Sequence, residues 1–551
     1  MKLEKEMRAY ALKNAIEYGS AVVGKVLPKL FNHGLDKKEI GKIMPELNRI
    51  VSEVNKLSAA QREKEYEEVK MFVKEREIVE KTLPELENVS DKMVFRLAPY
   101  PSGALHIGNA KTYLLNALYA EKYNAKILLV MDDTIGSEEK QTTKESYGLI
   151  EDGFKWLGVK YEKPVYYKSD RLEIYYKYAE DLIKKGKAYV CSCLQDDFKS
   201  FKEKEKDCPH RRQSVKVDLK LWKEMFKAKE GSLALRIKTS MQDPNPAFRD
   251  RVLFKISDRE HPRVGKKYRV WPTLELSWAI DDHLLGITHI LRGNDLAMET
   301  EMEKFIWDIF GWKHATVNHA GLVRIEGMGA KISKSKSQKE VKSGEFTGWD
   351  DPRTWSLQSL KRRGFRPEAI REFVKEIGLN RQDITIPIDS LYAINRKLID
   401  KEANRYFFVS EPKKIKIEGV KEKSVVEMPL HPDEPSRGAR KLHAGNEFFV
   451  SDKLEKNTFY RLMHLFNFKN EKFVSKDVDM KLNAKMIHWL PADDKNVNVK
   501  VLMEDGAWVA GLGEPDLKKI SKKEIVQFER FGFVILDDKT PNEFLFWFLH
   551  K

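Results

Sequence analysis

The chain has 551 residues, which is too long for a single hydrophobic core and indicates several domains. Hydrophobic residues make up 41% and charged residues 34%, a composition that excludes a disordered chain. The formal net charge of +15 favours a polyanionic partner, nucleic acid ahead of membrane, because Lys and Arg gather near phosphates. A lysine-rich surface that serves only solubility is the alternative.

The first residues carry charges throughout, and no segment of the sequence approaches a membrane-spanning apolar stretch. We therefore expect a soluble, cytoplasmic protein that does not bind membranes. The three cysteines are too few for a disulfide framework, which agrees with a reducing compartment.

Residues 1–88 are predicted to form helices. Apolar positions recur at intervals of three and four, and Ser58-Ala59-Ala60-Gln61 resembles a capping box. A helical appendage that contacts RNA and a purely structural cap are equally consistent with this pattern.

The pattern changes at Met93 to a βαβ unit. A short apolar strand, MVFRLA, is followed by a Pro/Gly-rich turn, a helix from Asn109 to Tyr123 and a second strand, KILLVM. A turn between a strand and a helix N-terminus is the place where an open α/β sheet holds a nucleotide. These residues therefore predict a nucleotide-binding fold.

Three changes of pattern follow along the chain. The Cys/His- and Lys-rich composition from about Tyr189 to Val264 predicts an insertion, after which the α/β rhythm resumes with HLLGITHILRGND. Residues 345–400 are predicted to be helical. Beyond residue 400, the alternating runs GNEFFVSD, NVNVKVLM and IVQFERFGFVILDD predict strands of β-barrels.

Two short motifs carry candidate chemistry. In APYPSGALHIGN, residues 98–109, Gly108 lets a phosphate approach the backbone, and His106 can donate a hydrogen bond to an oxygen that gains charge. The second motif is KISKS, residues 331–335, whose ammonium groups can close over a triphosphate, with Lys334 stabilising the departing pyrophosphate. Each motif is weak by itself, since most such histidines are turn or core residues and most such lysine runs are solvated loops.

Together the two motifs resemble the HIGH and KMSKS signatures of class I aminoacyl-tRNA synthetases, here as HIGN and KISKS. The resemblance extends from about residue 90 to the C-terminus through PNPAFRDRVLFKI, AIDDHLLGITHILRGNDL, GWDDPRTWSLQSLKRRGFRPEAIREF, RYFFV, MPLHPDEP and IVQFERFGF. These segments are similar to the archaeal-type glutamyl-tRNA synthetases and to the related glutaminyl enzymes.

The resemblance implies a multidomain α/β plus β protein built around a Rossmann-type class I catalytic core. Its implied domains are the two halves of the catalytic domain at 89–188 and 267–344, the second with the KISKS loop, an acceptor-stem insertion at 189–266, a helical connector at 345–400, and a β-barrel anticodon-binding region at 401–551. The helical N-terminal appendage at 1–88, predicted from its apolar spacing, precedes them.

The choice between glutamate and glutamine depends on a cation. A substrate carboxylate is bound best by a guanidinium, which donates two parallel hydrogen bonds. Arg292 matches the position where glutamate enzymes place that cation and glutaminyl enzymes carry an uncharged residue. Arg96 matches a second pocket arginine, Asp132 rather than Asp133 matches the carboxylate that holds the α-ammonium group, and Asp295 matches the ligand of the ATP ribose.

The resemblance thus implies three overlapping sets of site residues. They are, for glutamate binding, Arg96, Ala98, Tyr100, Asp132 and Arg292; for ATP binding, His106, Gly108, Asn109, Asp295, Lys331 and Lys334; and for catalysis, His106, Gly108, Lys331 and Lys334. The chain departs from the family at Asn109, at Val130, where an arginine is frequent, and at Leu274, where a tyrosine is frequent. The last two departures alter the expected shape of the amino-acid pocket.

The cysteines suggest a metal site within the predicted insertion. Cys191, Cys193, Cys208 and His210 form a four-ligand set with short paired spacings, sufficient for a tetrahedral zinc ion. Several family members hold zinc in the same insertion. The alternative is a group of buried structural cysteines, since the intervening FKSFKEKEKD is poor in turn residues.

The implied activity is glutamate–tRNA ligation. The enzyme would activate glutamate with Mg²⁺-bound ATP and transfer it to the 3′ end of tRNA-Glu, with tRNA-Gln open as a second substrate. The alternatives are a glutaminyl-tRNA synthetase, which Arg292 argues against, and a catalytically silent tRNA-binding relative, which His106, Gly108 and KISKS argue against. The oligomeric state is open, with a monomer favoured.

Overall fold

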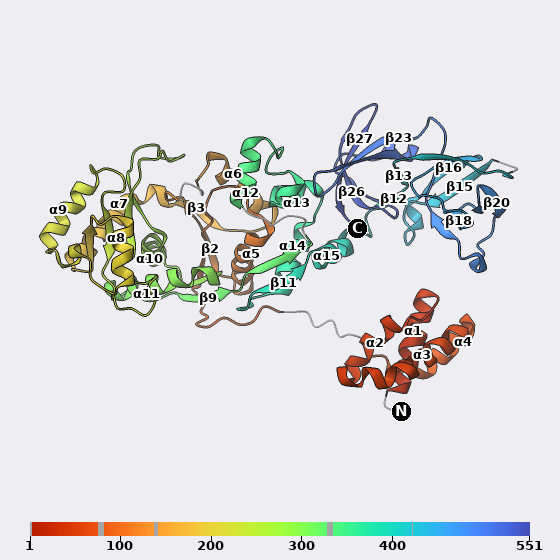
Figure 1. Ribbon diagram of the computed structural model, residues 1–551, viewed down its shortest axis with the longest axis horizontal. Helices are drawn as coiled ribbons and strands as arrows, with labels where there is room; N and C mark the ends of the chain where they lie inside the picture. The colour runs from red at the N-terminus through yellow and green to blue at the C-terminus, as the bar shows by residue number, and fades with distance from the viewer. Residues whose placement is uncertain (1–2, 75–81, 137–140, 328–333, 421–422) are drawn as a thin grey trace. The chain divides into compact units, whose positions relative to one another are not determined.

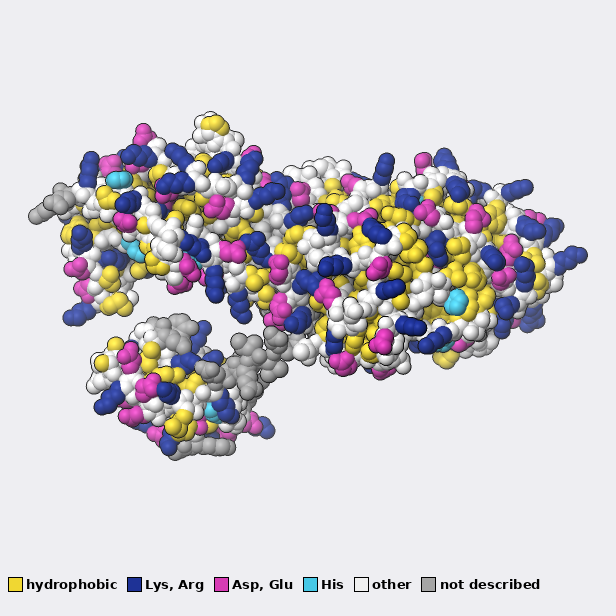
Figure 2. Space-filling model, turned by 180° about the vertical axis from the view of Figure 1, so that it is seen from behind, with side chains coloured by type: hydrophobic (Ala, Val, Ile, Leu, Met, Phe, Trp, Pro, Cys, Tyr) yellow, Lys and Arg dark blue, Asp and Glu magenta, His cyan; other side chains and the backbone are white. Residues whose placement is uncertain are grey.

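The structure is a computed structural model that describes residues 3–74, 82–136, 141–327, 334–420 and 423–551 (Figure 1). It divides into two compact units, Met1–Lys81 and Thr82–Lys551. Within the described residues, no helix combines the length and the apolar character that a membrane span requires. On the face seen in Figure 2, Lys and Arg side chains are scattered among acidic ones rather than gathered in one patch.

The first unit is a small helical bundle. Its helices are α1 (Glu4–Tyr18), α2 (Val23–Leu30), α3 (Ile40–Lys56) and α4 (Ala59–Val69), and α1 packs against the other three. Leu12, Leu30 and Leu47 are fully buried between them. The predicted capping box is confirmed, because Ser58 Oγ accepts from the Gln61 N–H and Gln61 Oε1 accepts from the Ser58 N–H at 2.9 Å.

The second unit begins with a parallel sheet. Strands β1 (Val94–Leu97), β2 (Lys126–Met131) and β3 (Glu162–Tyr167) pair in that order, and β8 (His289–Gly293) pairs with β9 (Thr316–Ala320). The Thr288 N–H donates to the Val94 carbonyl at 2.9 Å, which places β8 beside β1. Parallel strands need crossover helices, here α5 (Ile107–Lys122), α6 (Lys144–Trp156), α7 (Leu172–Lys184), α10 (Leu274–Leu284) and α11 (Ala297–Phe310).

The βαβ unit expected from Met93 onward is present. Strand β1, helix α5 and strand β2 occupy the predicted segments. Phe95, Leu97 and Leu129 of the two strands are fully buried in one cluster with Leu114 and Tyr119 of α5. Such continuous apolar strands are typical of a parallel sheet covered by helices on both faces.

A four-stranded antiparallel sheet separates the two halves of the parallel sheet along the chain. Its strands are β4 (Ala188–Cys191), β5 (Ala234–Ile237), β6 (Val252–Ile256) and β7 (Val270–Pro272), accompanied by α8 (Gln195–Glu203) and α9 (Val215–Met225). Trp222 of α9 and Trp271 of β7 are buried in its core. Helix α8 includes the first six residues of FKSFKEKEKD, residues 198–207, so this segment between the metal-ligand candidates is helical over most of its length.

The stretch predicted to be helical contains α13 (Leu357–Arg363), α14 (Pro367–Ile377) and α15 (Asp389–Ile399), preceded by α12 (Lys334–Ser343). It also contains an unexpected strand, β11 (Ile384–Pro387), which pairs in parallel with β10 (Val323–Glu326). A four-residue strand of this kind is set by its partner rather than by its own sequence. Helix α13 contacts strands of the C-terminal sheet.

The C-terminal part is built of β-strands (Figure 1). The largest sheet has the order β12-β25-β26-β27-β23-β24-β13, and its edge strands β12 (Asn404–Tyr406) and β13 (Phe408–Ser410) are consecutive in the chain, so the sheet curls into a nearly closed barrel. The other members are β23 (Val497–Leu502), β24 (Trp508–Gly513), β25 (Ile525–Phe528), β26 (Gly532–Lys539) and β27 (Phe544–His550).

Smaller sheets with a separate core lie within residues 413–491. Their strands are β14 (Lys413–Lys416), β15 (Ser424–Pro429), β16 (Ala439–Ala444), β17 (Glu447–Val450), β18 (Phe459–Leu462), β19 (Asn467–Lys469), β20 (Lys472–Ser475), β21 (Lys485–Ile487) and β22 (Leu490–Pro491). The strands predicted from GNEFFVSD, NVNVKVLM and IVQFERFGFVILDD are β17, β23 and the pair β25 and β26.

Candidate active site

A cavity of about 340 Å³ lies at the carboxyl ends of β1 and β8, beside the N-terminus of α5. This is the position where open α/β sheets bind ligands. The cavity is lined by seven of the residues expected from the sequence: Arg96, Ala98, His106, Gly108, Asn109, Arg292 and Asp295. Tyr100 and Asp132 are described but do not line it.

His106 is the N-cap residue of α5. Its ring Nδ1 accepts a hydrogen bond from the Asn109 N–H at 3.3 Å, and Asn109 Oδ1 accepts from the His106 N–H at 2.9 Å. Asn109 therefore closes a reciprocal capping box, which gives the HIGN departure a structural role. Because Nδ1 accepts, the neutral imidazole carries its proton on Nε2, the tautomer that can donate to a phosphate oxygen.

Glycines leave room for the functional side chains. A Cβ added at Gly108 would lie 3.1 Å from the His106 ring, and one added at Gly293 would lie 2.2 Å from Asp295 Oδ1. Asp295 is exposed, and no described residue forms a hydrogen bond or ion pair with its carboxylate. That carboxylate is available for the two hydroxyls of a ribose.

The part of the cavity lined by Arg96 and Arg292 is organised around Trp278. Three cations lie over its ring: the guanidinium carbons of Arg96 and Arg292 at 4.8 and 5.4 Å from the centroid, and Lys168 Nζ at 4.8 Å. Each cation has its own buried carboxylate: Arg96 Nε pairs with Asp282 at 2.5 Å, Lys168 Nζ with Asp132 at 2.9 Å and Arg292 Nη2 with Glu303 at 2.6 Å.

One of the three guanidinium nitrogens of Arg292 has no hydrogen-bond partner among the described residues. Its two terminal nitrogens both donate to Glu303, at 2.8 and 2.6 Å, whereas its buried Nε has no partner among the described residues. An unsatisfied buried N–H is costly, so this edge of the guanidinium favours an incoming acceptor. Burial raises the pKa of the Glu303 carboxyl, while the charge of Arg292 opposes that rise.

The two adjacent aspartates after β2 have different environments. Asp133 accepts from the Ser169 N–H at 2.9 Å, from Ser169 Oγ at 2.7 Å and from the Tyr147 hydroxyl at 3.0 Å, so its carboxylate is structural. Burial raises the pKa of the Asp132 carboxyl, and Lys168 opposes this. A substrate α-ammonium group would have to share Asp132 with Lys168.

Several functional candidates were missed by sequence reasoning. Lys168 and Glu303 belong to none of the motifs found in the sequence. Trp278 lies in α10, just before the AIDDHLL segment, and no motif included it. Lys111 lines the cavity, is buried, and donates from Nζ to the Gly321 carbonyl at 3.1 Å. Lys111 lies three residues after Gly108 in the first turns of α5, and this position near the predicted phosphate site could have identified it from the sequence. Val130 and Leu274, the two departures expected to alter the pocket, do not line the cavity.

Part of the KISKS motif lies outside the described residues, which omit 328–333 and therefore Lys331. Lys334 is the first residue of α12, and only its backbone is described. The predicted roles of both lysines stay predictions.

Comparisons with known proteins decide the family. The model described as tRNA synthetases class I (E and Q), catalytic domain, matches residues 92–401, and two models of anti-codon binding domains of the same class match residues 403–488 and 486–537. The chain belongs to the class I glutamyl/glutaminyl-tRNA synthetase family.

Full-length relatives agree with this assignment. The synthetase is 41% identical to a glutamate–tRNA ligase of Methanocaldococcus jannaschii and 41% identical to one of Pyrococcus furiosus, with 100% of both chains covered in each case. A glutamate-tRNA synthetase structure from Elizabethkingia anophelis shares 18% identity with a TM-score of 0.41, covering 57% of this chain and 72% of that chain, a likeness too distant to inform the site.

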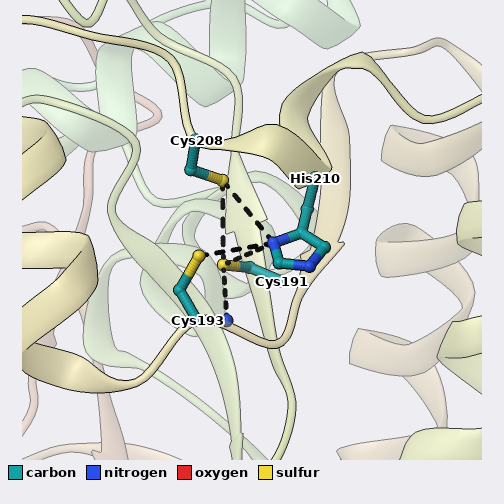
Figure 3. A group of neighbouring side chains, drawn as sticks. All are labelled: Cys191, Cys193, Cys208 and His210. Atoms are coloured by element: carbon teal, nitrogen blue, oxygen red, sulfur yellow. Dashed lines mark hydrogen bonds between the residues drawn. The ribbon is translucent and has the colours of Figure 1, made fainter.

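The synthetase holds its cysteines together in the antiparallel sheet region. Cys191, Cys193, Cys208 and His210 place one ligand atom each within 4.8 Å of one another, and Figure 3 shows their sulfurs and imidazole turned toward a common centre. Cys191 Sγ lies 3.9 Å from Cys208 Sγ, and Cys193 Sγ lies 3.3 Å from His210 Nδ1.

These distances fit a metal. Zinc–sulfur bonds of about 2.3 Å in a tetrahedron place sulfurs about 3.8 Å apart. The other ring nitrogen of His210, Nε2, lies 2.8 Å from Ser192 Oγ, and the Cys193 N–H donates to Cys191 Sγ at 3.4 Å. Such outer hydrogen bonds orient metal ligands in proteins.

Proposed function

We propose that this synthetase activates glutamate with Mg²⁺-bound ATP and transfers the glutamyl group to the 3′ end of tRNA-Glu. The single observation that carries the choice of glutamate is the buried, unpaired Nε of Arg292 at the cavity that also contains His106 and Asp295. The curated glutamate–tRNA ligases that match the whole chain support the same choice.

The first step is formation of glutamyl-adenylate. An oxygen of the glutamate α-carboxylate attacks the α-phosphorus of ATP, and the bond to the β-phosphate oxygen breaks to release pyrophosphate. His106 donates to a non-bridging oxygen of the α-phosphate, and Gly108 admits that phosphate to the N-terminus of α5. Lys331 and Lys334 stabilise the leaving pyrophosphate, and Asp295 holds the ribose.

The amino acid is oriented by the cation-rich end of the cavity. Arg292 and Arg96 bind the side-chain carboxylate, and Ala98 borders the same site. Asp132 and Tyr100 do not line the cavity; we assign the α-ammonium group to Asp132, beside Lys168, and the role of Tyr100 stays a prediction. In the second step a hydroxyl of the terminal adenosine attacks the glutamyl carbonyl and AMP leaves. No covalent intermediate with the enzyme is needed.

Other parts of the chain supply binding surfaces. The antiparallel sheet contacts the acceptor stem, and its Cys191, Cys193, Cys208 and His210 hold one structural zinc ion, which their donor set and mutual distances support. The C-terminal barrels bind the anticodon, as the matches to anti-codon binding domains suggest.

The function is tested by aminoacylation of purified tRNA-Glu and tRNA-Gln, each with labelled glutamate and labelled glutamine. We expect glutamate to be attached to tRNA-Glu, and the tRNA-Gln reactions define the second substrate. Faster attachment of glutamine than of glutamate would overturn the proposal.

A further inference from the structure

The loop that carries His106 is held by a segment of the connector. The Leu357 N–H donates to the Leu105 carbonyl at 2.8 Å, and the Ile107 N–H donates to the Trp355 carbonyl at 3.3 Å. His106 and Ser356 thus lie opposite each other as an isolated antiparallel bridge. The backbone position of His106 therefore depends on residues 355–357.

Trp355, the first residue of this segment, has an unusual backbone conformation. Its φ is +50°, in the left-handed region that bulky residues rarely adopt, and its side chain is buried. Such a conformation persists only where surrounding contacts maintain it. One of these contacts is the guanidinium of Arg363, whose central carbon lies 4.6 Å from the Trp355 ring centroid.

Arg363 joins that ring to the C-terminal barrel. It is fully buried, its Nε donates to the Phe548 carbonyl at 3.2 Å, and its Nη2 donates to the Leu549 carbonyl at 2.7 Å and to Glu504 Oε2 at 3.1 Å. Phe548 and Leu549 belong to β27. One guanidinium therefore touches both the barrel sheet and the residue that holds the His106 loop.

We propose that Arg363 is a positioning residue that makes the placement of His106 depend on the state of the anticodon-binding barrel. A displacement of β27 on tRNA binding moves the carbonyls that hold Arg363, and Trp355 and its backbone bond to Ile107 move with it. This inference rests on the proposed role of His106.

The chain offers a matched control in the preceding residue. Arg362 ties the same helix to the same sheet, because it donates to Asp537 of β26 at 3.0 and 2.8 Å and lies 4.1 Å from the Trp547 ring. It also donates to Asp350 of the connector at 2.7 Å. None of its contacts among the described residues reaches residues 355–357 or the His106 loop. Loss of Arg362 weakens the interface without cutting the proposed connection.

The experiment is a double-mutant cycle between enzyme and tRNA. The kcat of aminoacylation is measured for the wild type, Arg363→Gln and Arg362→Gln, each with cognate tRNA and with tRNA carrying one substituted anticodon base. In the wild type the base substitution lowers kcat. In Arg363→Gln this penalty shrinks by roughly 2- to 30-fold, the usual range of such coupling, whereas Arg362→Gln retains it.

Two outcomes overturn the inference. If the base substitution lowers kcat equally in Arg363→Gln and the wild type, Arg363 is only structural. If it does not lower kcat in the wild type, the anticodon-binding barrel has no effect on the His106 loop for Arg363 to transmit. If Arg363→Gln does not fold, Arg363→Lys replaces it, because lysine keeps the charge but lacks the planar fork. Failure of the proposed function is seen separately, as absent charging of cognate tRNA with glutamate by the wild type.

Discussion

Two buried polar clusters of this synthetase differ in how their charges are compensated. At the amino-acid end of the cavity, three cations over Trp278 each pair with a carboxylate of the protein, so the cluster is charge-balanced by itself. In the Cys/His cluster, four ligand atoms face one another without a cation of the protein among them. The first cluster is charge-balanced by its own side chains, whereas the zinc ion that we propose for the second would supply the cation that balances its ligands.

This difference predicts how each cluster fails. Removal of one partner from a balanced pair leaves an uncompensated buried charge, so substrate binding and stability suffer together. Removal of a metal ligand abolishes a binding event that contributes directly to folding. The four predictions below test these contrasting failures, beginning with the largest expected effect.

The largest effect is expected at the Cys/His cluster. Metal analysis should find about one zinc per chain. Cys208→Ser should lose the zinc and unfold the surrounding sheet, because the binding of structural zinc contributes about 10 kcal/mol or more to the free energy of folding. Elemental analysis and limited proteolysis measure the two effects. The matched control is Ser192→Ala, which removes only the partner of His210 and should lower zinc affinity about 10- to 100-fold. A metal-free preparation of unchanged stability would contradict the site.

The next effect concerns Arg292. The double variant Arg292→Gln/Glu303→Gln removes both charges and leaves no buried ion unpaired. The kcat/KM for glutamate should fall by roughly 150-fold, about 3 kcal/mol, because the substrate carboxylate loses its cation. Glutamine should be affected less, since an amide does not need that cation.

A second buried pair provides the control for this variant. Arg440 and Glu514 of the barrel region are also fully buried, with Nε and Oε1 2.9 Å apart. Arg440→Gln/Glu514→Gln should leave the preference for glutamate over glutamine unchanged. An equal loss for both amino acids in Arg292→Gln/Glu303→Gln would remove Arg292 from the selection of substrate.

The third case is a buried titratable group, His550, whose two ring nitrogens lie beside the Asn395 amide and the Lys551 oxygen. Burial lowers the pKa of His550 to about 4, from 6.5, and Asn395 Nδ2 lies 3.0 Å from its Nε2. Because the unfolded chain binds the proton first, stability is complete above pH 6.5 and is lost as the pH falls toward 4. Between pH 7 and 5 the wild type should lose about 2 kcal/mol relative to His550→Gln.

Chemical denaturation at each pH measures this difference. The wild-type curve alone does not isolate it, because burial raises the pKa of Glu514 to about 7, and that carboxyl lowers stability as the pH rises from 4.5. Parallel pH profiles for the wild type and His550→Gln would show that His550 makes no contribution.

The smallest effect is expected from Trp278→Phe. A smaller ring weakens the contact with three cations by about 0.5–1 kcal/mol, so the KM for glutamate should rise about two- to fivefold. Trp222→Phe is the control, because Trp222 is buried among aromatic rings and no described cation lies over it. An equal rise in both variants would indicate a packing effect only.

Features that depend on a short segment of the chain could be predicted from the sequence. The turn between β1 and α5 predicted His106 and Gly108 at a ligand site, and the match to HILRGND predicted Arg292, and the structure places all three around one cavity. The alternating runs beyond residue 400 predicted strands correctly: burial alternates along β17, β23 and β25, and the first five residues of β26 form a buried apolar run. These features depend on short segments of the chain.

The partners of the charged residues could not be predicted in this way. Arg292 does not pair with the two aspartates of AIDDHLL: Asp281 binds Arg171 and Asp282 binds Arg96, whereas Arg292 binds Glu303. Arg96 and Asp282 are separated by 186 positions. Such pairs are set by the packing of distant elements, as is the pairing of β10 with β11.

The strand order of the C-terminal barrel has a consequence for biosynthesis. The last strand of the chain, β27, lies in the middle of the seven-stranded sheet, between β26 and β23. During translation the earlier strands leave the ribosome with two unpaired edges that face each other across a gap. The barrel can therefore close only after residues 544–550 have been synthesised and have left the ribosome, and nascent chains that stall near residue 540 would expose both edges to other chains.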